Sequence, residues 1–262
     1  LDGLLAQLPE DDEHRAVARR LRADALLDRG RLGEAERAYA ELLADTDAAD
    51  EFGRLVIHVN RAISLRRGGR AEDAARAIEA GRAAHTNPLS DELEAHILIG
   101  EGAVAILRRE PATAAERLQR ASDLLTALDS EHALLGDTWH HQARLALQEK
   151  EPRRAFEKAN AALALWDRHH GPGSLDAART LLVMSDALHA LGHDDQAAGA
   201  ANVAAGILRD RHRPDDEVAL AELAVARAQG TEDPEAQRAC EASELVACRE
   251  ALAATTETAL SP

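Results

Sequence analysis

The chain has 262 residues, of which 45% are hydrophobic and only 2% are aromatic, and its formal net charge is −16. This acidity argues against direct binding to nucleic acids or to anionic membrane surfaces, because both need clustered Lys and Arg. No apolar run approaches the roughly 20 residues of a membrane-spanning helix, and no secretory signal is visible, so a cytoplasmic location is expected.

Helix-breaking residues divide the chain into predicted helices that follow one another in pairs. After an N-terminal extension at 1–10, the pairs are expected at 11–29 with 32–45, 49–68 with 71–86, 89–109 with 111–128, 130–150 with 152–170, and 174–191 with 194–211. A further helix is expected at 214–229, another from Pro234 to about 255, and a frayed tail at 256–262. No segment alternates with the period of a strand, so the chain is predicted to be all-α.

The helix pairs repeat the same residue types at a nearly constant interval. Each pair has a turn position, an Ala anchor five residues after it, and a small residue seven residues before it. The turn positions are Gly30, Gly69, Arg109, Lys150 and Gly192. The anchors are Ala35, Ala74, Ala114, Ala155 and Ala197, spaced by 39, 40, 41 and 42 residues. The small residues are Ala23, Ala62, Gly102, Ala143 and Ser185, which are expected to let the two helices of a pair pack closely.

This pattern resembles the tetratricopeptide repeat (TPR) family, and its long period resembles the subtype found in kinesin light chain. Trp139 stands where that subtype has an aromatic residue in the first helix, whereas Arg19 and His58 differ from it. The resemblance covers about residues 11–211 and implies a right-handed α-solenoid of about five TPR-like helix pairs. The repeats would span 11–48, 49–88, 89–129, 130–172 and 173–213, with capping helices at 214–255.

The sequence contains none of the common catalytic motifs. A P-loop, a GxSxG elbow, a GxGxxG turn after a strand and an HExxH helix are all absent from it. The doublets His140-His141 and His169-His170 cannot each chelate one metal, because adjacent helical residues point about 100° apart. A protein without catalytic activity, metal or cofactor is therefore expected.

The two cysteines, Cys240 and Cys248, lie eight residues apart on what the sequence predicts to be one helix. Such a separation corresponds to a rise of about 12 Å, which is too far for a disulfide. They are therefore predicted to be reduced, small apolar packing residues in a reducing compartment.

The TPR resemblance implies that the first helix of each pair lines a concave face. By register, the residues expected to bind a peptide or another ligand there are Arg20, Asp24, Val59, Ile63, Arg66, His96, Ile99, His140, Arg144, Arg179 and Asp186. The centre of this face would be apolar and its two ends charged. A register error of one residue would instead place Val59 and Ile63 in the core between helices.

The resulting hypothesis is an interaction scaffold that binds a peptide or a helix of a protein partner in its concave groove, with self-association also possible. The alternative is a ligand- or peptide-sensing module of a bacterial transcriptional regulator, whose flanking domain would lie outside this segment. The Ala and Arg richness and the presence of only two Lys favour a bacterial source. Asn60 fits one position of the carboxylate clamp known in the family, but the matching Lys is absent, which argues against that mode.

Overall fold

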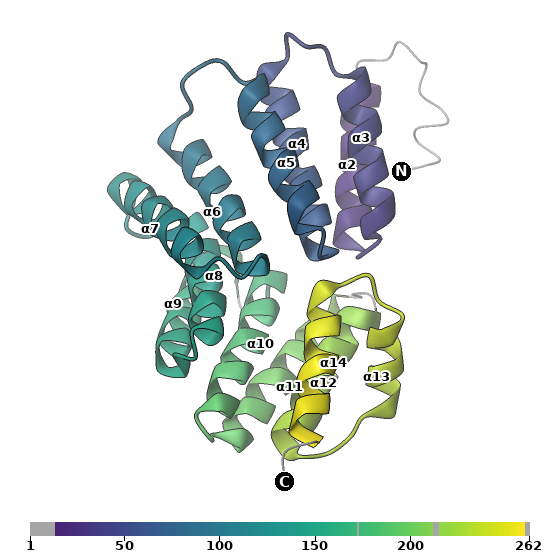
Figure 1. Ribbon diagram of the computed structural model, residues 1–262, viewed down its shortest axis with the longest axis vertical. Coiled ribbons are helices and arrows are strands. Elements are labelled where there is room, and N and C mark those ends of the chain that lie inside the picture. Colours follow the sequence, from purple (N-terminus) through teal and green to yellow (C-terminus); the bar gives the residue numbers. More distant parts are fainter. Residues whose placement is uncertain (1–13, 172, 212–214, 260–262) are drawn as a thin grey trace. The chain divides into compact units, whose positions relative to one another are not determined.

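The computed structural model describes residues 14–171, 173–211 and 215–259, and in this part the chain is built from α-helices without strands (Figure 1). The all-α prediction is therefore confirmed. The chain divides into two compact units, residues 1–89 (unit 1) and 90–262 (unit 2). This boundary lies within one residue of the predicted boundary between the second and third repeats. The predicted extension at 1–10 lies outside the described residues.

Unit 1 consists of two helix pairs. Helix α2 (His14–Asp28) packs on α3 (Leu32–Asp45), and α4 (Glu51–Arg67) packs on α5 (Ala71–Ala84). Helix α3 also packs on α4, which joins the two pairs. The order in sequence is thus the order of packing, as expected for helical repeats.

Unit 2 continues the same pattern with three pairs and three further helices. Its elements are α6 (Asp91–Leu107), α7 (Pro111–Leu128), α8 (Leu134–Gln148), α9 (Pro152–His170), α10 (Leu175–Ala190), α11 (Asp194–Asp210), α12 (Asp215–Gln229), α13 (Pro234–Glu241) and α14 (Val246–Ala259). Each first helix contacts the next one, α6 with α8, α8 with α10, and α10 with α12. Within each unit taken by itself, we call the side formed by its first helices the first-helix face of that unit; these helices are α2 and α4 in unit 1, and α6, α8, α10 and α12 in unit 2.

The predicted packing register is confirmed in every pair. The five Ala anchors and the five small residues of the first helices are all buried. The approach is close at Gly102, where an added Cβ would lie 2.7 Å from Cγ of Leu118, four residues after the anchor Ala114. Ser185 at the same register donates its hydroxyl hydrogen to the carbonyl of Ala197 at 2.9 Å. Small side chains are therefore required at this position by the distance between the paired helices.

All five turn positions have a left-handed backbone. The φ angles are 71° at Gly30, 79° at Gly69, 61° at Arg109, 61° at Lys150 and 77° at Gly192. In each turn the N–H of the following residue bonds to a carbonyl five residues back, as from Glu110 to Ala105 at 3.0 Å. This is the helix-ending motif in which Gly is preferred. Two of the second helices then begin at Pro111 and Pro152, where a missing N–H costs nothing.

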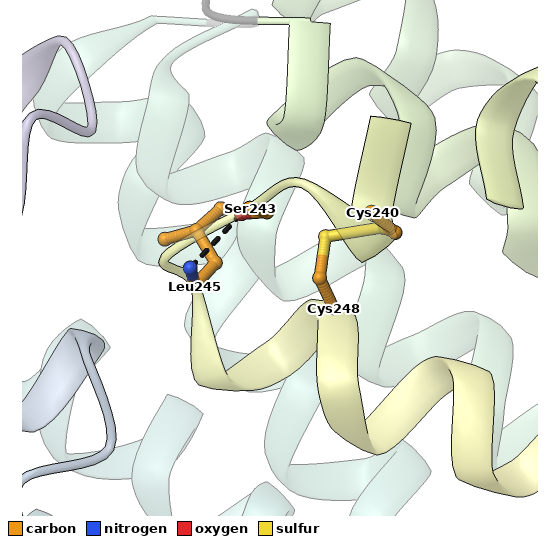
Figure 2. Close-up of a disulfide and its surroundings, with 4 residues drawn as sticks. All are labelled: Cys240, Ser243, Leu245 and Cys248. Atoms are coloured by element: carbon orange, nitrogen blue, oxygen red, sulfur yellow. Dashed lines mark hydrogen bonds between the residues drawn. A yellow bond between two sulfur atoms is a disulfide. The ribbon is translucent and has the colours of Figure 1, made fainter. Parts of the chain in front are cut away.

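The prediction of one continuous helix after Pro234 is wrong. Helix α13 ends at Glu241 and α14 begins at Val246, continuing to Ala259, beyond the expected end near 255. In the turn between them, the side-chain oxygen of Ser243 accepts a hydrogen bond from the N–H of Leu245 at 2.9 Å (Figure 2). Such a local side-chain bond competes with the helical ladder and favours a turn.

This break also overturns the prediction of reduced cysteines. The Cα atoms of Cys240 on α13 and Cys248 on α14 are only 5.0 Å apart, and a disulfide joins the two side chains (Figure 2). Both residues are almost completely buried. The expected distance of about 12 Å would apply only within a straight helix. The disulfide therefore fastens the last helix to the one before it.

Candidate functional site

On the first-helix face of unit 1, Asp24 and Asn60 are brought together from α2 and α4. Oδ1 of Asp24 accepts a hydrogen bond from the hydroxyl of Tyr39 at 2.6 Å and another from the amide of Asn60 at 3.3 Å. Burial, and then the contact with Asp24, raise the pKa of Tyr39, so its hydroxyl stays protonated and acts as a donor. The carboxylate of Asp24 is thus held between two helices by neutral donors.

The other predicted residues of unit 1 differ widely in exposure. Arg20 is exposed, Ile63 and Arg66 are half-buried, and Val59 is buried, with 8% of its surface exposed. Val59 therefore belongs to the core side, as the alternative register predicted. Ile63 keeps part of its side chain at the surface.

In unit 2, the predicted apolar centre of the face is largely core. Ile99 is only 5% exposed and packs in a cluster with Leu98, Leu125 and Leu135, which come from α6, α7 and α8. His96 is half-buried, and burial lowers its pKa. Ile99 therefore stabilises the fold and offers little surface to a ligand.

His140 on α8 is part of a hydrogen-bond network with α9 and α10. The hydroxyl of Thr180 donates to the carbonyl of Asp176 at 2.7 Å, and its oxygen accepts from Nε1 of Trp166 at 3.2 Å. Nδ1 of His140 lies 3.0 Å from the same oxygen. Because the hydroxyl hydrogen is already used, Nδ1 of His140 must carry the hydrogen of this bond. The network therefore fixes both the ring orientation and the tautomer of His140.

Charged pairs connect α10 to α12 across the first-helix face. A guanidinium nitrogen of Arg179 lies 3.2 Å from Oε1 of Glu217, whose side chain is buried. Asp186, two turns further along α10, pairs with Arg227 on α12. Burial raises the pKa of the Asp186 carboxyl, whereas Arg227 acts in the opposite direction. These pairs bind two successive first helices to each other.

Arg144 is half-buried on α8, which packs against α10. Burial lowers the pKa of its guanidinium, while the carboxylates of Glu250 on α14 and of Asp186 act in the opposite direction. Arg144 thus interacts electrostatically with Glu250 on α14 and with Asp186 on α10, which itself pairs with Arg227 on α12. Three of the residues predicted from the sequence, His140, Arg144 and Asp186, lie on neighbouring first helices in this region.

The sequence analysis missed Glu217 and Arg227, which belong to α12. They follow Arg179 and Asp186 by 38 and 41 residues, which is close to the repeat period. Extending the register of the first helices into α12 would have identified both. The sequence indicated α12 only as a capping helix, so its residues were not assigned to the first-helix face.

Among the described residues there is neither a cluster of metal-ligating side chains nor a helix able to span a membrane. No group of three or more His, Cys, Asp and Glu side chains in this part of the chain could hold a metal ion. No helix among the same residues is both long and apolar enough to cross a membrane.

Comparison with known proteins identifies the fold. No family model and no curated protein matches this chain, whereas 37 chains of solved structures are similar to it. The crystal structure of the apo form of RapI superimposes with a TM-score of 0.57 and 14% identity, covering 92% of this chain. The MamA crystal structure gives a TM-score of 0.41 and 17% identity, covering 77% of this chain and 96% of its own.

RapI is a TPR-type helical repeat protein, and the likeness to RapI therefore identifies the fold of this chain. The chain has a TPR-type fold. It spans 66% of the RapI chain, slightly less than two thirds. At 14% identity this likeness concerns the fold alone, and the resemblance of the TPR-type array to the long-period kinesin light chain subtype stays a prediction.

Proposed function

We propose that this chain is a non-catalytic interaction module that binds a peptide or a helical segment of a partner protein on its first-helix face. The TPR-type fold supports a protein-binding role, since helical arrays of this kind expose an extended surface built from successive repeats. The partner would be a protein or peptide rather than a nucleic acid, because the net charge of −16 opposes phosphate binding.

The observation that carries the proposal is the mixed surface formed by α8, α10 and α12 in unit 2. Leu147 follows Arg144 by three residues on α8, and Leu182 follows Arg179 by three and precedes Asp186 by four on α10, so both half-buried leucines share a helix face with charged side chains. Arg179 and Asp186 in turn pair with Glu217 and Arg227 of α12. Apolar contacts to these leucines would supply affinity, and the charged groups would fix the orientation of the bound segment. Ile99 has no part in this surface because it is buried.

The test compares two substitutions that place the same charge on different surfaces. Leu182→Asp alters the first-helix face, whereas Val203→Asp alters the second helix α11, where Val203 is 55% exposed. Each full-length variant is immobilised and used to capture proteins from a lysate of the source cells, after circular dichroism has shown that it is still helical. The partner captured by the wild type should be lost with Leu182→Asp and kept with Val203→Asp.

A folded Leu182→Asp variant that captures the same partner at the same level would refute binding on this face. The milder Leu182→Ala serves if the aspartate variant unfolds, because it removes apolar contact without adding a charge. A partner lost with Val203→Asp alone would place the interaction on the second helices.

A cytoplasmic location is part of the proposal, and the disulfide provides a direct test of it. The fold brings Cys240 and Cys248 within disulfide distance, but a reducing cytosol would keep this bond open in the cell. If the location is cytoplasmic, both thiols should therefore react with an alkylating reagent that is added before lysis, when the chain is then denatured in its presence. Protection of both thiols until a reductant is added would instead indicate an oxidising compartment.

A further inference from the structure

The last helix, α14, carries few side chains that can hold it in place by packing. Of its residues 246–254, whose side chains the structure describes, only Cys248 is fully buried. Val246 and Leu252 are half-buried, and the sequence at 255–259 supplies only Thr, Glu and Ala. A helix of this length is marginal in water unless an apolar face is packed. The docking of α14 should therefore depend on its disulfide to α13.

Helix α12 is buried on two opposite sides. Ala221 and Ala228 pack with residues of α10 and α11. Ala219, Leu223 and Ala226 lie on the other side of the helix, since successive helical residues point about 100° apart. At most 7% of any of these three residues is exposed. Besides α10 and α11, α12 packs mainly on α13 and α14, so these two helices cover the second side (Figure 1).

We propose that α14 is a redox-controlled lid on α12. While the bond between Cys240 and Cys248 is closed, α14 stays docked; when the bond is reduced, α14 leaves and Leu223 becomes exposed. Arg227 follows Leu223 by four residues, so the uncovered surface borders the charged side chains of the proposed binding surface. The inference goes beyond the proposed function, because it adds a control of the surface and can be tested without any partner.

The reaction that opens the lid is thiol–disulfide exchange with a small thiol such as glutathione. A glutathione thiolate attacks one protein sulfur, which forms a mixed disulfide and releases the other cysteine as a thiolate. A second glutathione thiolate then attacks the glutathione sulfur of the mixed disulfide. The products are two protein thiols, each with a proton from solvent, and one oxidised glutathione. Oxidised glutathione reverses both steps and closes the lid.

One half of the latch is held in place without the sulfur–sulfur bond. At the start of α13, the carboxylate of Asp233 accepts a hydrogen bond from the N–H of Ala236 at 3.0 Å, and Ala236 is buried. The turn after α13 keeps the hydrogen bond between Ser243 and Leu245 (Figure 2). Cys240 should therefore stay in position after reduction, ready for the bond to form again.

The experiment measures hydrogen exchange by mass spectrometry on the full chain, first with the disulfide closed and then after reduction with glutathione. Thiols alkylated after denaturation report the state of the bond in each sample. The amides of α14 should exchange at least about tenfold faster in the reduced chain, because the cross-link no longer restricts the open state. Oxidised glutathione should restore the slow exchange. Helix α7 of the same unit is the internal control and should not change.

The matched variant is Cys240→Ala, Cys248→Ala, which keeps small apolar side chains but cannot form the bond. Its α14 should exchange as fast as in the reduced wild type, with or without reductant. Hydroxyl-radical footprinting of this variant should label Leu223 more than in the oxidised wild type. Labelling of Leu125, which is completely buried between other helices, should stay unchanged.

Three results would overturn the lid. Unchanged exchange of α14 after reduction would show that packing alone keeps the helix docked. An equal increase in α7 and α14 would show that the disulfide stabilises the whole unit and controls no single helix. A bond that stays closed in excess reduced glutathione would show that the cysteines form a permanent cross-link. Each of these results leaves the proposed binding surface intact, whereas loss of partner binding on that surface would leave the lid intact.

Discussion

The two sides of a first helix in unit 2 are held by different kinds of contact, as two adjacent residues of α10 show. Ser185 faces the partner helix, is completely buried, and donates to the carbonyl of Ala197. Asp186 lies on the first-helix face and pairs with Arg227 of the next first helix. Packing on the core side depends on the size of the side chain and on the distance between the paired helices. Contacts on the other side depend on attraction between charged side chains of different repeats.

The same division explains which side can vary. A small residue is needed at one register of every first helix, because the paired helix lies directly against it. On the first-helix face, unit 1 joins α2 to α4 through Asp24 and the neutral amide of Asn60, whereas unit 2 joins α10 to α12 through ion pairs. Several chemistries can thus connect neighbouring first helices, which leaves that face able to acquire a binding function.

The largest expected effect tests the core side. Gly102→Leu should lower the free energy of unfolding by roughly 3 kcal/mol or more, because even a Cβ at this position meets Leu118 at 2.7 Å. The matched control is Gly199→Leu on α11, where an added Cβ meets nothing within 4 Å. Leu is a better helix former than Gly, so the control should be neutral or more stable by up to about 1 kcal/mol. Similar urea midpoints for the two variants would refute the packing register.

The next effect tests the charged side. Glu217→Ala should lower the free energy of unfolding by about 2–3 kcal/mol, because the half-buried guanidinium of Arg179 then loses the carboxylate that pairs with it. The double variant Arg179→Met, Glu217→Leu should recover most of that loss, because apolar side chains of similar volume often replace a buried pair without penalty. Urea unfolding of the wild type, of the single variants Arg179→Met and Glu217→Leu, and of the double variant gives the coupling energy directly. A double variant as unstable as the sum of the singles would mean that the two residues act independently.

The core side was the part of the fold that could be predicted from the sequence. The small residues, anchors and turns recur at fixed positions in each repeat. They therefore identify the residues that face the paired helix, such as Ala23, Gly102 and Ala114, because the short distance between the helices imposes the same limit on side-chain size in each repeat. The break between α13 and α14 was not predictable in this way. It depends on one Ser side chain bonding to a nearby N–H and on a disulfide that only the folded chain brings together.

The first-helix face was predicted only in part. Register assigned Asp24, His140, Arg144 and Asp186 to this face, and in the structure Asp24, His140 and Asp186 bond to residues of other first helices. The same register also assigned Ile99 to the face, although Ile99 is buried. Helix α6 carries apolar residues almost all round, with nine of its residues buried, so its periodicity cannot separate core from surface. Which charges pair across the face depends on side-chain reach between helices, which the sequence does not give.

Lowering the pH is expected to destabilise the core side, by less than the substitutions above. Burial lowers the pKa of His58 and of His96 below the ordinary value of 6.5. Below about pH 6.5 the unfolded chain therefore binds protons more readily than the folded chain, and stability must fall as the pH decreases towards the folded pKa values. Urea unfolding at pH 7.5, 6.5, 5.5 and about 5 should show this decline, in a range above the usual titration of the carboxylates.

The control for this pH dependence is His193→Gln, which changes an exposed His at the start of α11. It should leave the slope unchanged, whereas the double variant His58→Gln, His96→Gln should flatten it. An unchanged slope in the double variant would assign the pH dependence to other groups.

The smallest effect concerns the turns that join the two sides of each pair. Arg109 has a φ of 61°, a left-handed backbone that costs a residue with a Cβ about 1–2 kcal/mol. Arg109→Gly relieves that strain but also makes the unfolded chain more flexible, so a net gain of about 0.5 kcal/mol is expected.

The reverse change, Gly69→Ala at the equivalent turn with a φ of 79°, should destabilise by about 1 kcal/mol. Arg120→Gly, in the exposed middle of α7, should also destabilise by about 1 kcal/mol. Thermal melts that give Arg109→Gly the same sign as Arg120→Gly would show that the turn at Arg109 is not strained, and that the five turns do not share one conformation in solution.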